Sequence, residues 1–114
     1  MTQYSEAVLL RLFIGENDEH DGRPLHEAIV LKARERGLAG ATVLRGSMGY
    51  GRSSRLHTSK ILRLSEDLPL VIEIVDAADK VEAYLAEAAP MLGSCLVTLE
   101  KVRVVRYGHD AGLG

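Results

Sequence analysis

The stretch EAVLLRLFIG, Glu6 to Gly15, predicts the first element of the fold. Its side chains alternate between two sides of the chain, and this period of two is typical of a β-strand. One side is aliphatic throughout, whereas the other mixes apolar residues with a cation. The first set is Val8, Leu10, Leu12 and Ile14, and the second is Leu9, Arg11 and Phe13. The stretch therefore predicts a strand with one face that belongs in a core.

Helical and strand patterns follow this strand in turn. Pro24 stands where a first helical turn accepts proline, and an apolar stripe then runs at helical spacing to Gly37, a typical helix stop. Asp76 is expected to cap a second helix over residues 77–89, which Pro90 ends. Three more strands are predicted in GATVLRGSM, LPLVIEIVD and SCLVTLEKVRVVRY (40–48, 68–76 and 94–107), the last one long or bent. ENDEHDG (16–22) is expected to be a polar loop and KILRL (60–64) a short return strand.

The order of these elements is β-α-β-β-α-β, which is the ferredoxin-like plan of two split βαβ units. It predicts an α+β fold in which an antiparallel sheet carries both helices on one face. A chain of 114 residues suits one domain, so residues 1–114 are expected to fold as a unit. Residues 46–60 are expected to form a mobile loop between the second and third main strands.

The second face of the predicted sheet is more apolar than a face that meets water. It presents Leu9, Phe13, Val71 and Val75, together with Arg11 and Glu73. With both helices on the first face, such an apolar surface usually marks an interface. The pattern predicts an oligomer with its sheets turned inward, and packing by the C-terminal tail is the alternative.

Composition narrows the class of protein. The chain has no basic, apolar leader at its start and no apolar run near the roughly 20 residues of a membrane helix, so a cytoplasmic protein that is not embedded in a membrane is expected. The single cysteine, Cys95, stands in an apolar run and is interpreted as a core thiol.

The net charge of -2 hides an uneven distribution. Residues 36–65 carry six basic and no acidic residues, whereas the rest of the chain carries eight basic and sixteen acidic ones. A binder of duplex nucleic acid is more often basic throughout, so no nucleic-acid partner is expected. The basic stretch favours a small anionic ligand, and a solvated basic face is the alternative.

The same stretch contains LRGSMGYGRSSRLHTSK, Leu44 to Lys60, which is rich in glycine, serine and arginine. Successive glycines let backbone N–H groups converge on an anion, and Arg52 and Arg55 can add bidentate contacts. GSMGYG matches neither the P-loop spacing nor G-x-G-x-x-G. The glycines are equally compatible with a simple hinge, and we expect a flexible loop whose two ends hold an anion.

Metal and catalytic readings have less support in the sequence. None of the four histidines forms an H-x-x-x-H pair or a pair with the cysteine, so no metal cofactor is expected. Ser53 and Ser54 lack a nucleophile elbow, so the protein is not expected to be an enzyme. Two alternatives remain: a small ferredoxin-like oligomeric enzyme, and a metal-binding trimer of the copper-tolerance type.

The order of elements and several short motifs resemble the PII-like signalling proteins. The motifs are GATV at the second strand, GYGR followed by HT, and VRVVRYG in the last strand. The resemblance covers nearly the whole chain and points to the PII-like branch described as domain of unknown function 190. It implies a homotrimer of ferredoxin-like subunits with a mobile loop and clefts between subunits. Such clefts bind adenine nucleotides in PII proteins, and the loop contacts a partner, often a transporter or an enzyme.

The resemblance also implies where a ligand would bind. Gly40 and Thr42 match the positions that line the base of the nucleotide in PII proteins. Gly49, Gly51 and Arg52 match the start of the mobile loop, which lies beside the phosphates.

The last part of the chain agrees with the family at one place and departs from it at another. Arg106 resembles the arginine of the end strand that reaches phosphate, and Arg103 is a nearby candidate. PII proteins carry a glycine-rich loop with a lysine before that strand, whereas this chain has APMLGSC at residues 89–95. The missing lysine argues against tight triphosphate binding and leaves a monophosphate, a cyclic nucleotide or another anion open.

Overall fold

A computed structural model describes residues 3–51, 57–58 and 67–106 of the chain. The main sheet contains β1 (Gln3–Gly15), β4 (Thr42–Arg45), β7 (Pro69–Asp76) and β8 (Leu96–Arg106). The helices are α1 (Leu25–Glu35), α2 (Ala78–Ala88) and the short 3-10 helix η1 (Ala89–Met91). Two small ladders complete the described elements, β2 (Glu19–His20) with β3 (Arg23–Pro24), and β5 (Met48–Gly49) with β6 (His57–Thr58).

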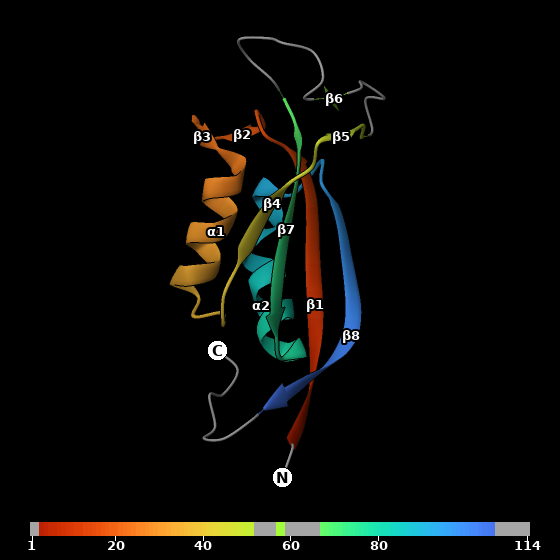
Figure 1. Ribbon diagram of the computed structural model, residues 1–114. Helices are drawn as coiled ribbons and strands as arrows, with labels where there is room; N and C mark the ends of the chain where they lie inside the picture. The colour runs from red at the N-terminus through yellow and green to blue at the C-terminus, as the bar shows by residue number, and fades with distance from the viewer. Residues whose placement is uncertain (1–2, 52–56, 59–66, 107–114) are drawn as a thin grey trace.

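The main sheet has the strand order β4-β7-β1-β8, and its pairs are all antiparallel. Both helices cover one face of this sheet, as Figure 1 shows. The arrangement confirms the predicted α+β, ferredoxin-like fold. None of the helices in the described ranges is long and apolar enough to span a membrane.

The core lies between the helices and the aliphatic face of β1. Leu10 and Leu12 are fully buried there, as the alternation in the sequence predicts. Tyr84 of α2 is also fully buried, and its hydroxyl donates a hydrogen bond of 2.9 Å to the carbonyl oxygen of Ile29 in α1. This bond joins the two helices inside the core. Cys95 is half-buried against the core, and burial raises the pKa of its thiol.

The helix-free face of the sheet carries an apolar row that crosses all four strands. The register places Leu44 opposite Val71, Val71 opposite Phe13, and Phe13 opposite Leu96. Leu44, Phe13 and Leu96 are 47%, 36% and 59% exposed, so the described chain leaves much of the row uncovered. We call these four residues the outer apolar row. The second apolar face that the sequence predicts is therefore present.

The connection that follows α1 is built as a helix-stop motif. The N–H of Gly37 donates to Arg34 and the N–H of Leu38 donates to Ala33, at 3.1 and 3.0 Å, which is the pattern of a Schellman motif. Gly37 has a φ of 75°, which an L-residue with a side chain adopts only with strain. The predicted stop at Gly37 is confirmed, and it sends the chain toward β4.

Three local expectations were wrong. The predicted polar loop contains the β2–β3 hairpin, because Asp21 and Gly22 have φ values of 53° and 77° and form a tight turn. Pro24 precedes α1 as its N-cap instead of lying in the first turn. Asp76 ends β7 and makes no cap bond to α2, whose N-cap is Ala77.

A fourth expectation, the return strand at residues 60–64, lies outside the described residues and stays a prediction.

Candidate ligand site

A shallow pocket of about 300 Å³ opens beside the start of β4. Its lining comes from the loop between α1 and β4 and from the neighbouring strand β7, and consists of Ala39, Gly40, Ala41, Thr42, Glu73 and Val75. Two of the residues predicted for the ligand, Gly40 and Thr42, thus lie in one pocket. The loop residues are small, so a ligand in this pocket would meet backbone groups and the Thr42 hydroxyl.

The loop is held from the junction of β7 and α2. Asp76 is fully buried, and its Oδ2 accepts a hydrogen bond of 2.9 Å from the N–H of Ala39. Its Oδ1 accepts a second one of 2.7 Å from the N–H of Ala77. Lys80 donates from Nζ to the carbonyl oxygen of Gly37 at 3.1 Å, and the same Nζ lies 3.9 Å from Asp76 Oδ2. Lys80 therefore holds the Gly37 end of the stretch from Gly37 to Ala39, and Asp76 holds the Ala39 end.

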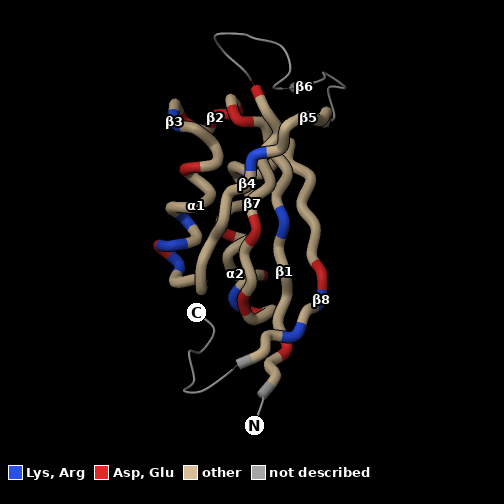
Figure 2. Tube along the Cα trace, in the orientation of Figure 1, with Lys and Arg blue, Asp and Glu red and all other residues tan. Residues whose placement is uncertain are grey.

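An acidic side chain, Glu73, also lines this pocket. Its Oε2 pairs with Nε of Arg11 at 2.9 Å, and Nη1 of Arg11 reaches Glu100 at 3.2 Å. Figure 2 shows these opposite charges on neighbouring strands β7, β1 and β8. The hydrogen bond to Glu73 is the main reason that the pKa of Arg11 is raised. Arg11 Nε contacts only one oxygen of Glu73, and a carboxylate has further lone pairs that can accept a hydrogen bond from a hydroxyl or amine of a ligand.

The glycines at the start of the predicted mobile loop pack closely against β7. A Cβ at Gly46 would lie 2.9 Å from Cγ of Pro69, and one at Gly49 would lie 3.2 Å from the same atom. The N–H of Gly46 also donates to the carbonyl oxygen of Pro69 at 2.7 Å. A Cβ at Gly51 would have no neighbour within 4 Å among the residues that the structure describes. Close packing therefore explains two of these glycines, and the hypothesis of backbone donors for an anion stays a prediction.

The predicted arginines differ in what the structure says of them. Arg52 and Arg55 lie outside the described residues, as do the positions 52–56 and 59–60 of the predicted mobile loop. Arg103 lies near the end of β8 with its guanidinium carbon 4.9 Å from the ring centroid of Tyr4, a cation–π contact. The backbone of Arg106 pairs with Gln3 at the end of the sheet.

Within one chain, the described residues that were predicted to form one ligand site lie in different parts of the structure. Gly40 and Thr42 share the pocket, whereas β5, which holds Gly49, lies beyond one end of the main sheet and the end of β8 lies at the other (Figure 1). A single chain therefore does not gather the glycines and the end-strand arginines around one ligand. Glu73 and Val75 were expected only as members of the second sheet face, and their place in the pocket follows from the pairing of β4 with β7.

Acidic residues from elsewhere neutralise part of the basic stretch. Arg45 pairs with Glu16, and Arg36 pairs with Glu87 through Nε at 2.9 Å. The excess of positive charge that the sequence shows between residues 36 and 65 is thus smaller in the folded chain. The remaining cations of the stretch lie outside the described residues.

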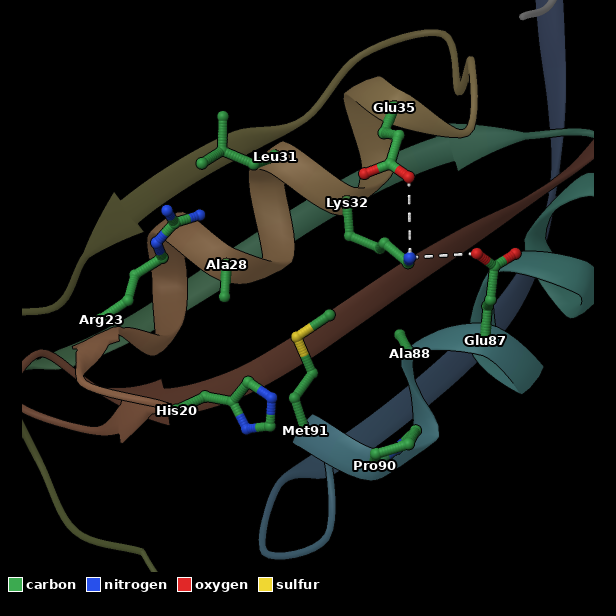
Figure 3. Close-up of a pocket in the computed structure, with 10 residues that line it drawn as sticks. All are labelled: His20, Arg23, Ala28, Leu31, Lys32, Glu35, Glu87, Ala88, Pro90 and Met91. Atoms are coloured by element: carbon green, nitrogen blue, oxygen red, sulfur yellow. Dashed lines mark ion pairs between the residues drawn. The ribbon is translucent and has the colours of Figure 1, made fainter.

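A second pocket, of about 320 Å³, lies between α1 and α2 on the other face of the molecule (Figure 3). Lys32 crosses it to Glu87 at 3.0 Å and also contacts Glu35 at 3.8 Å. The hydrogen bond between Lys32 and Glu87 raises the pKa of the lysine and is the main cause that lowers the pKa of the glutamate. Lys32, Glu35 and Glu87 therefore pair with one another along the wall of this pocket.

His20 lines the second pocket, and its Nε2 lies 3.4 Å from Asp21. Within the ranges that the structure describes, no three His, Cys, Asp or Glu side chains gather closely enough to hold a metal ion. The described residues thus give no support to the metal-binding alternative.

Two curated relatives are similar to most of this chain. Both are UPF0166 proteins of Aquifex aeolicus (strain VF5). The first is 38% identical over 97 residues, which cover 85% of this chain and 91% of the relative. The second is 33% identical over 99 residues, which cover 87% and 97%.

Among solved structures, the chain is similar to CPII from Thiomonas intermedia K12, a nitrogen regulatory PII-like protein bound to ADP, AMP and bicarbonate. The TM-score is 0.69 at 14% identity, and the match covers 90% of this chain and 91% of CPII. At this identity the likeness shows the fold, which is PII-like. The family model for domain of unknown function 190, described as "Uncharacterized ACR", matches residues 7–104. The chain therefore belongs to the DUF190 family and has the fold of the PII-like proteins.

Proposed function

We propose that this protein is a cytoplasmic, non-enzymatic sensor of the PII-like kind. It forms a homotrimer, binds an adenine nucleotide at the boundary between subunits, and transmits the bound state through residues 46–60 to a partner protein. The partner class that the fold suggests is a transporter or an enzyme. The observation that carries the proposal is the pocket lined by Gly40 and Thr42 at the edge of a PII-like sheet.

The outer apolar row supports assembly through the helix-free face. It crosses the sheet without a break, and its members Phe13 and Leu96 are substantially exposed. Contiguous apolar surfaces of this kind are typical of interfaces. The ion pairs between Arg11, Glu73 and Glu100 lie beside the row and give the interface a polar margin. Packing of three such faces against one another would bring each β4 pocket near a neighbouring subunit.

The chemistry of the pocket favours the nucleoside part of a nucleotide over its phosphates. Thr42 and Glu73 offer a hydroxyl and a carboxylate, which suit the hydroxyls of a ribose or the amine of a base. Arg11, the cation beside this pocket, is already paired with Glu73 and Glu100, so a phosphate requires cations from other parts of the assembly. Arg52, Arg55, Arg103 and Arg106 are the candidates for this role, with Gly49 and Gly51 as backbone donors. CPII, whose fold is similar, was solved with ADP and AMP.

The connection between α2 and β8 supports the expectation that the protein binds nucleotides with modest affinity. It forms the turn of η1 and continues to Cys95 with no lysine, where PII proteins carry a cationic phosphate loop. We therefore expect ADP and AMP to bind at least as well as ATP.

Isothermal titration calorimetry on the intact protein tests the site. ADP should bind, and Arg52→Ala or Arg106→Ala should weaken it by about ten-fold or more, because charge-assisted contacts contribute roughly 1.5–3 kcal/mol each. Arg34→Ala is the matched control, since Arg34 is an exposed residue of α1. If ADP, AMP and ATP all fail to bind, the proposed function is wrong. If they bind and neither substitution alters the affinity, the ligand lies elsewhere.

Hydrogen exchange tests the signalling part of the proposal. ADP should slow the exchange of backbone amides within residues 46–60, because a segment that reports a ligand must change its order on binding. Equal exchange with and without ADP would show that residues 46–60 do not transmit the bound state. Nucleotide binding, which calorimetry measures, would be unaffected by that result.

A further inference from the structure

We propose that Asp76 and Lys80 are positioning residues that hold the ligand pocket in its binding shape. They act on the backbone of the loop that carries Gly40 and Thr42, and contact with the ligand is not required. The inference rests on the proposed function for the identity of the ligand. It adds a pair of side chains, on the junction of β7 and α2, on which the affinity of the pocket depends.

Packing against the core anchors the loop on either side of Ala39 and Gly40, through Leu38 and Ala41. Ala39 has a small side chain, Gly40 has none, and both residues are exposed. The N–H groups of Gly37 and Leu38 are already used to end α1, so the N–H of Ala39 is the first one that leaves the helix. Without a hydrogen bond to this N–H, the peptide groups between the two anchors would sample several conformations. Such freedom lowers affinity, because a ligand must then order the loop when it binds.

Asp76 supplies that outside contact from a position of full burial. A buried carboxylate is retained only where hydrogen bonds compensate for the loss of water. Oδ2 accepts from Ala39 at 2.9 Å and Oδ1 accepts from Ala77 at 2.7 Å, so both oxygens are engaged. The first bond spans the sequence from the end of β7 to the loop. The second fixes the carboxylate itself, so the position of Ala39 is tied to the end of strand β7.

Lys80 holds the same loop from the first turn of α2, and we call Asp76 and Lys80 together the loop clamp. Its Nζ donates to the carbonyl oxygen of Gly37 at 3.1 Å and lies 3.9 Å from Asp76 Oδ2. Gly37 starts the loop and Ala39 lies at its centre, so the two side chains fix successive peptide groups. Glu73 and Val75, which complete the pocket, belong to the strand that ends at Asp76. One wall of the pocket therefore belongs to β7, and the other is hydrogen-bonded to the end of that strand.

The test compares three variants of the intact protein. Asp76→Asn keeps the shape of the side chain but offers one acceptor oxygen where the carboxylate offers two. Lys80→Met keeps the aliphatic stem and removes the ammonium group. Tyr84→Phe is the matched control, because it removes a buried hydrogen bond of α2 to α1 and none to the loop. Each variant is measured for thermal midpoint, for amide exchange at Ala39 without ligand, and for ADP affinity by calorimetry.

Asp76→Asn should speed exchange at Ala39 by about ten-fold and weaken ADP binding by about ten-fold, since hydrogen bonds to a charged acceptor are the stronger kind. Lys80→Met should act in the same direction by about two- to three-fold, because its contact is partly exposed. Tyr84→Phe should lower the thermal midpoint and leave ADP affinity within about two-fold of the wild type.

ADP affinity that Asp76→Asn leaves unchanged would overturn the proposal, as would an equal loss of affinity in Tyr84→Phe at a matched loss of thermal stability. If Asp76→Asn does not fold, the test rests on Lys80→Met. Unchanged amide exchange at Ala39 and unchanged ADP affinity in that variant would then overturn the proposal. If the wild-type protein binds no nucleotide, the proposed function fails, and exchange at Ala39 alone then decides whether the clamp holds the loop.

Discussion

Tyr84→Phe removes one hydroxyl from the centre of the core, and its effect on stability can be worked out as a function of pH. The hydroxyl donates to the carbonyl oxygen of Ile29 at 2.9 Å and is fully buried. A net contribution of about 1 kcal/mol is expected from such a bond at neutral pH. The variant should therefore unfold about 3–5 °C below the wild type, given the size of the chain.

The pH dependence follows from the ionisation of the phenol. Burial raises the pKa of Tyr84 from its ordinary value of 10.0 to about 12. Below pH 10 the hydroxyl is neutral in the folded and the unfolded chain, so its full contribution to stability is present. Between pH 10 and 12 the unfolded chain ionises and the folded chain does not. The wild type then loses about 1.4 kcal/mol of stability per pH unit, up to about 2.7 kcal/mol.

The phenylalanine variant lacks this loss, so the two stability curves should cross. With a difference of about 1 kcal/mol in the free energy of unfolding at neutral pH, the crossing falls at about pH 10.7. At pH 11.5 the variant should be more stable than the wild type by about 0.9 kcal/mol. Urea unfolding followed by circular dichroism, from pH 7 to 11.5 at one protein concentration, measures both curves. The two proteins differ only at position 84, so the difference between their stability curves isolates Tyr84.

A constant gap between the curves across this range would refute the reasoning. It would mean that Tyr84 ionises as readily in the folded chain as in the unfolded one. A crossing at a lower pH would instead indicate a weaker hydrogen bond to Ile29 together with the same burial. The position of the crossing thus reports the strength of the bond, and its existence reports the burial.

Three further predictions test other parts of the structure. Phe13→Glu places a charge in the outer apolar row and should leave monomers where light scattering finds an oligomer of the wild type; an unchanged mass would show that the helix-free face is not the interface. Gly37→Ala forces a side chain into a φ of 75° and should cost about 1 kcal/mol, seen as a fall of about 3–5 °C in the thermal midpoint; an unchanged midpoint would contradict the strain. Because Lys32 and Arg36 lower the pKa of Glu87, its contribution is present above pH 4.5 and is lost as the pH falls below that value. In Glu87→Gln, urea unfolding from pH 7 to 3 should therefore show a smaller decline in stability than the wild type shows, and equal declines would rule out the contribution.

Local patterns in the sequence are enough to predict the architecture of this protein. The alternation in Glu6–Gly15 and in residues 68–76 predicts strands, and the spacing of apolar residues before Gly37 predicts a helix that stops there. These signals are local, because side-chain period and glycine conformation depend on near neighbours in the chain. The order of the elements then leaves the ferredoxin-like sheet as the simplest arrangement. A local signal was also overlooked, since Asp21–Gly22 is a typical hairpin turn.

Contacts between residues that are distant in the sequence depend on how the strands and helices pack. Pairing of β1 with β7 and β8 brings Arg11 to Glu73 and Glu100, which lie 62 and 89 residues away in the sequence. The end of β7 brings Asp76 to Ala39, 37 residues away, and so turns an expected helix cap into a contact that holds the pocket loop. Gly40 and Thr42 were predicted by resemblance, whereas the two walls of their pocket depend on the register of β4 against β7. Register is fixed by the packing of a whole face, so the sequence of either strand leaves it undetermined.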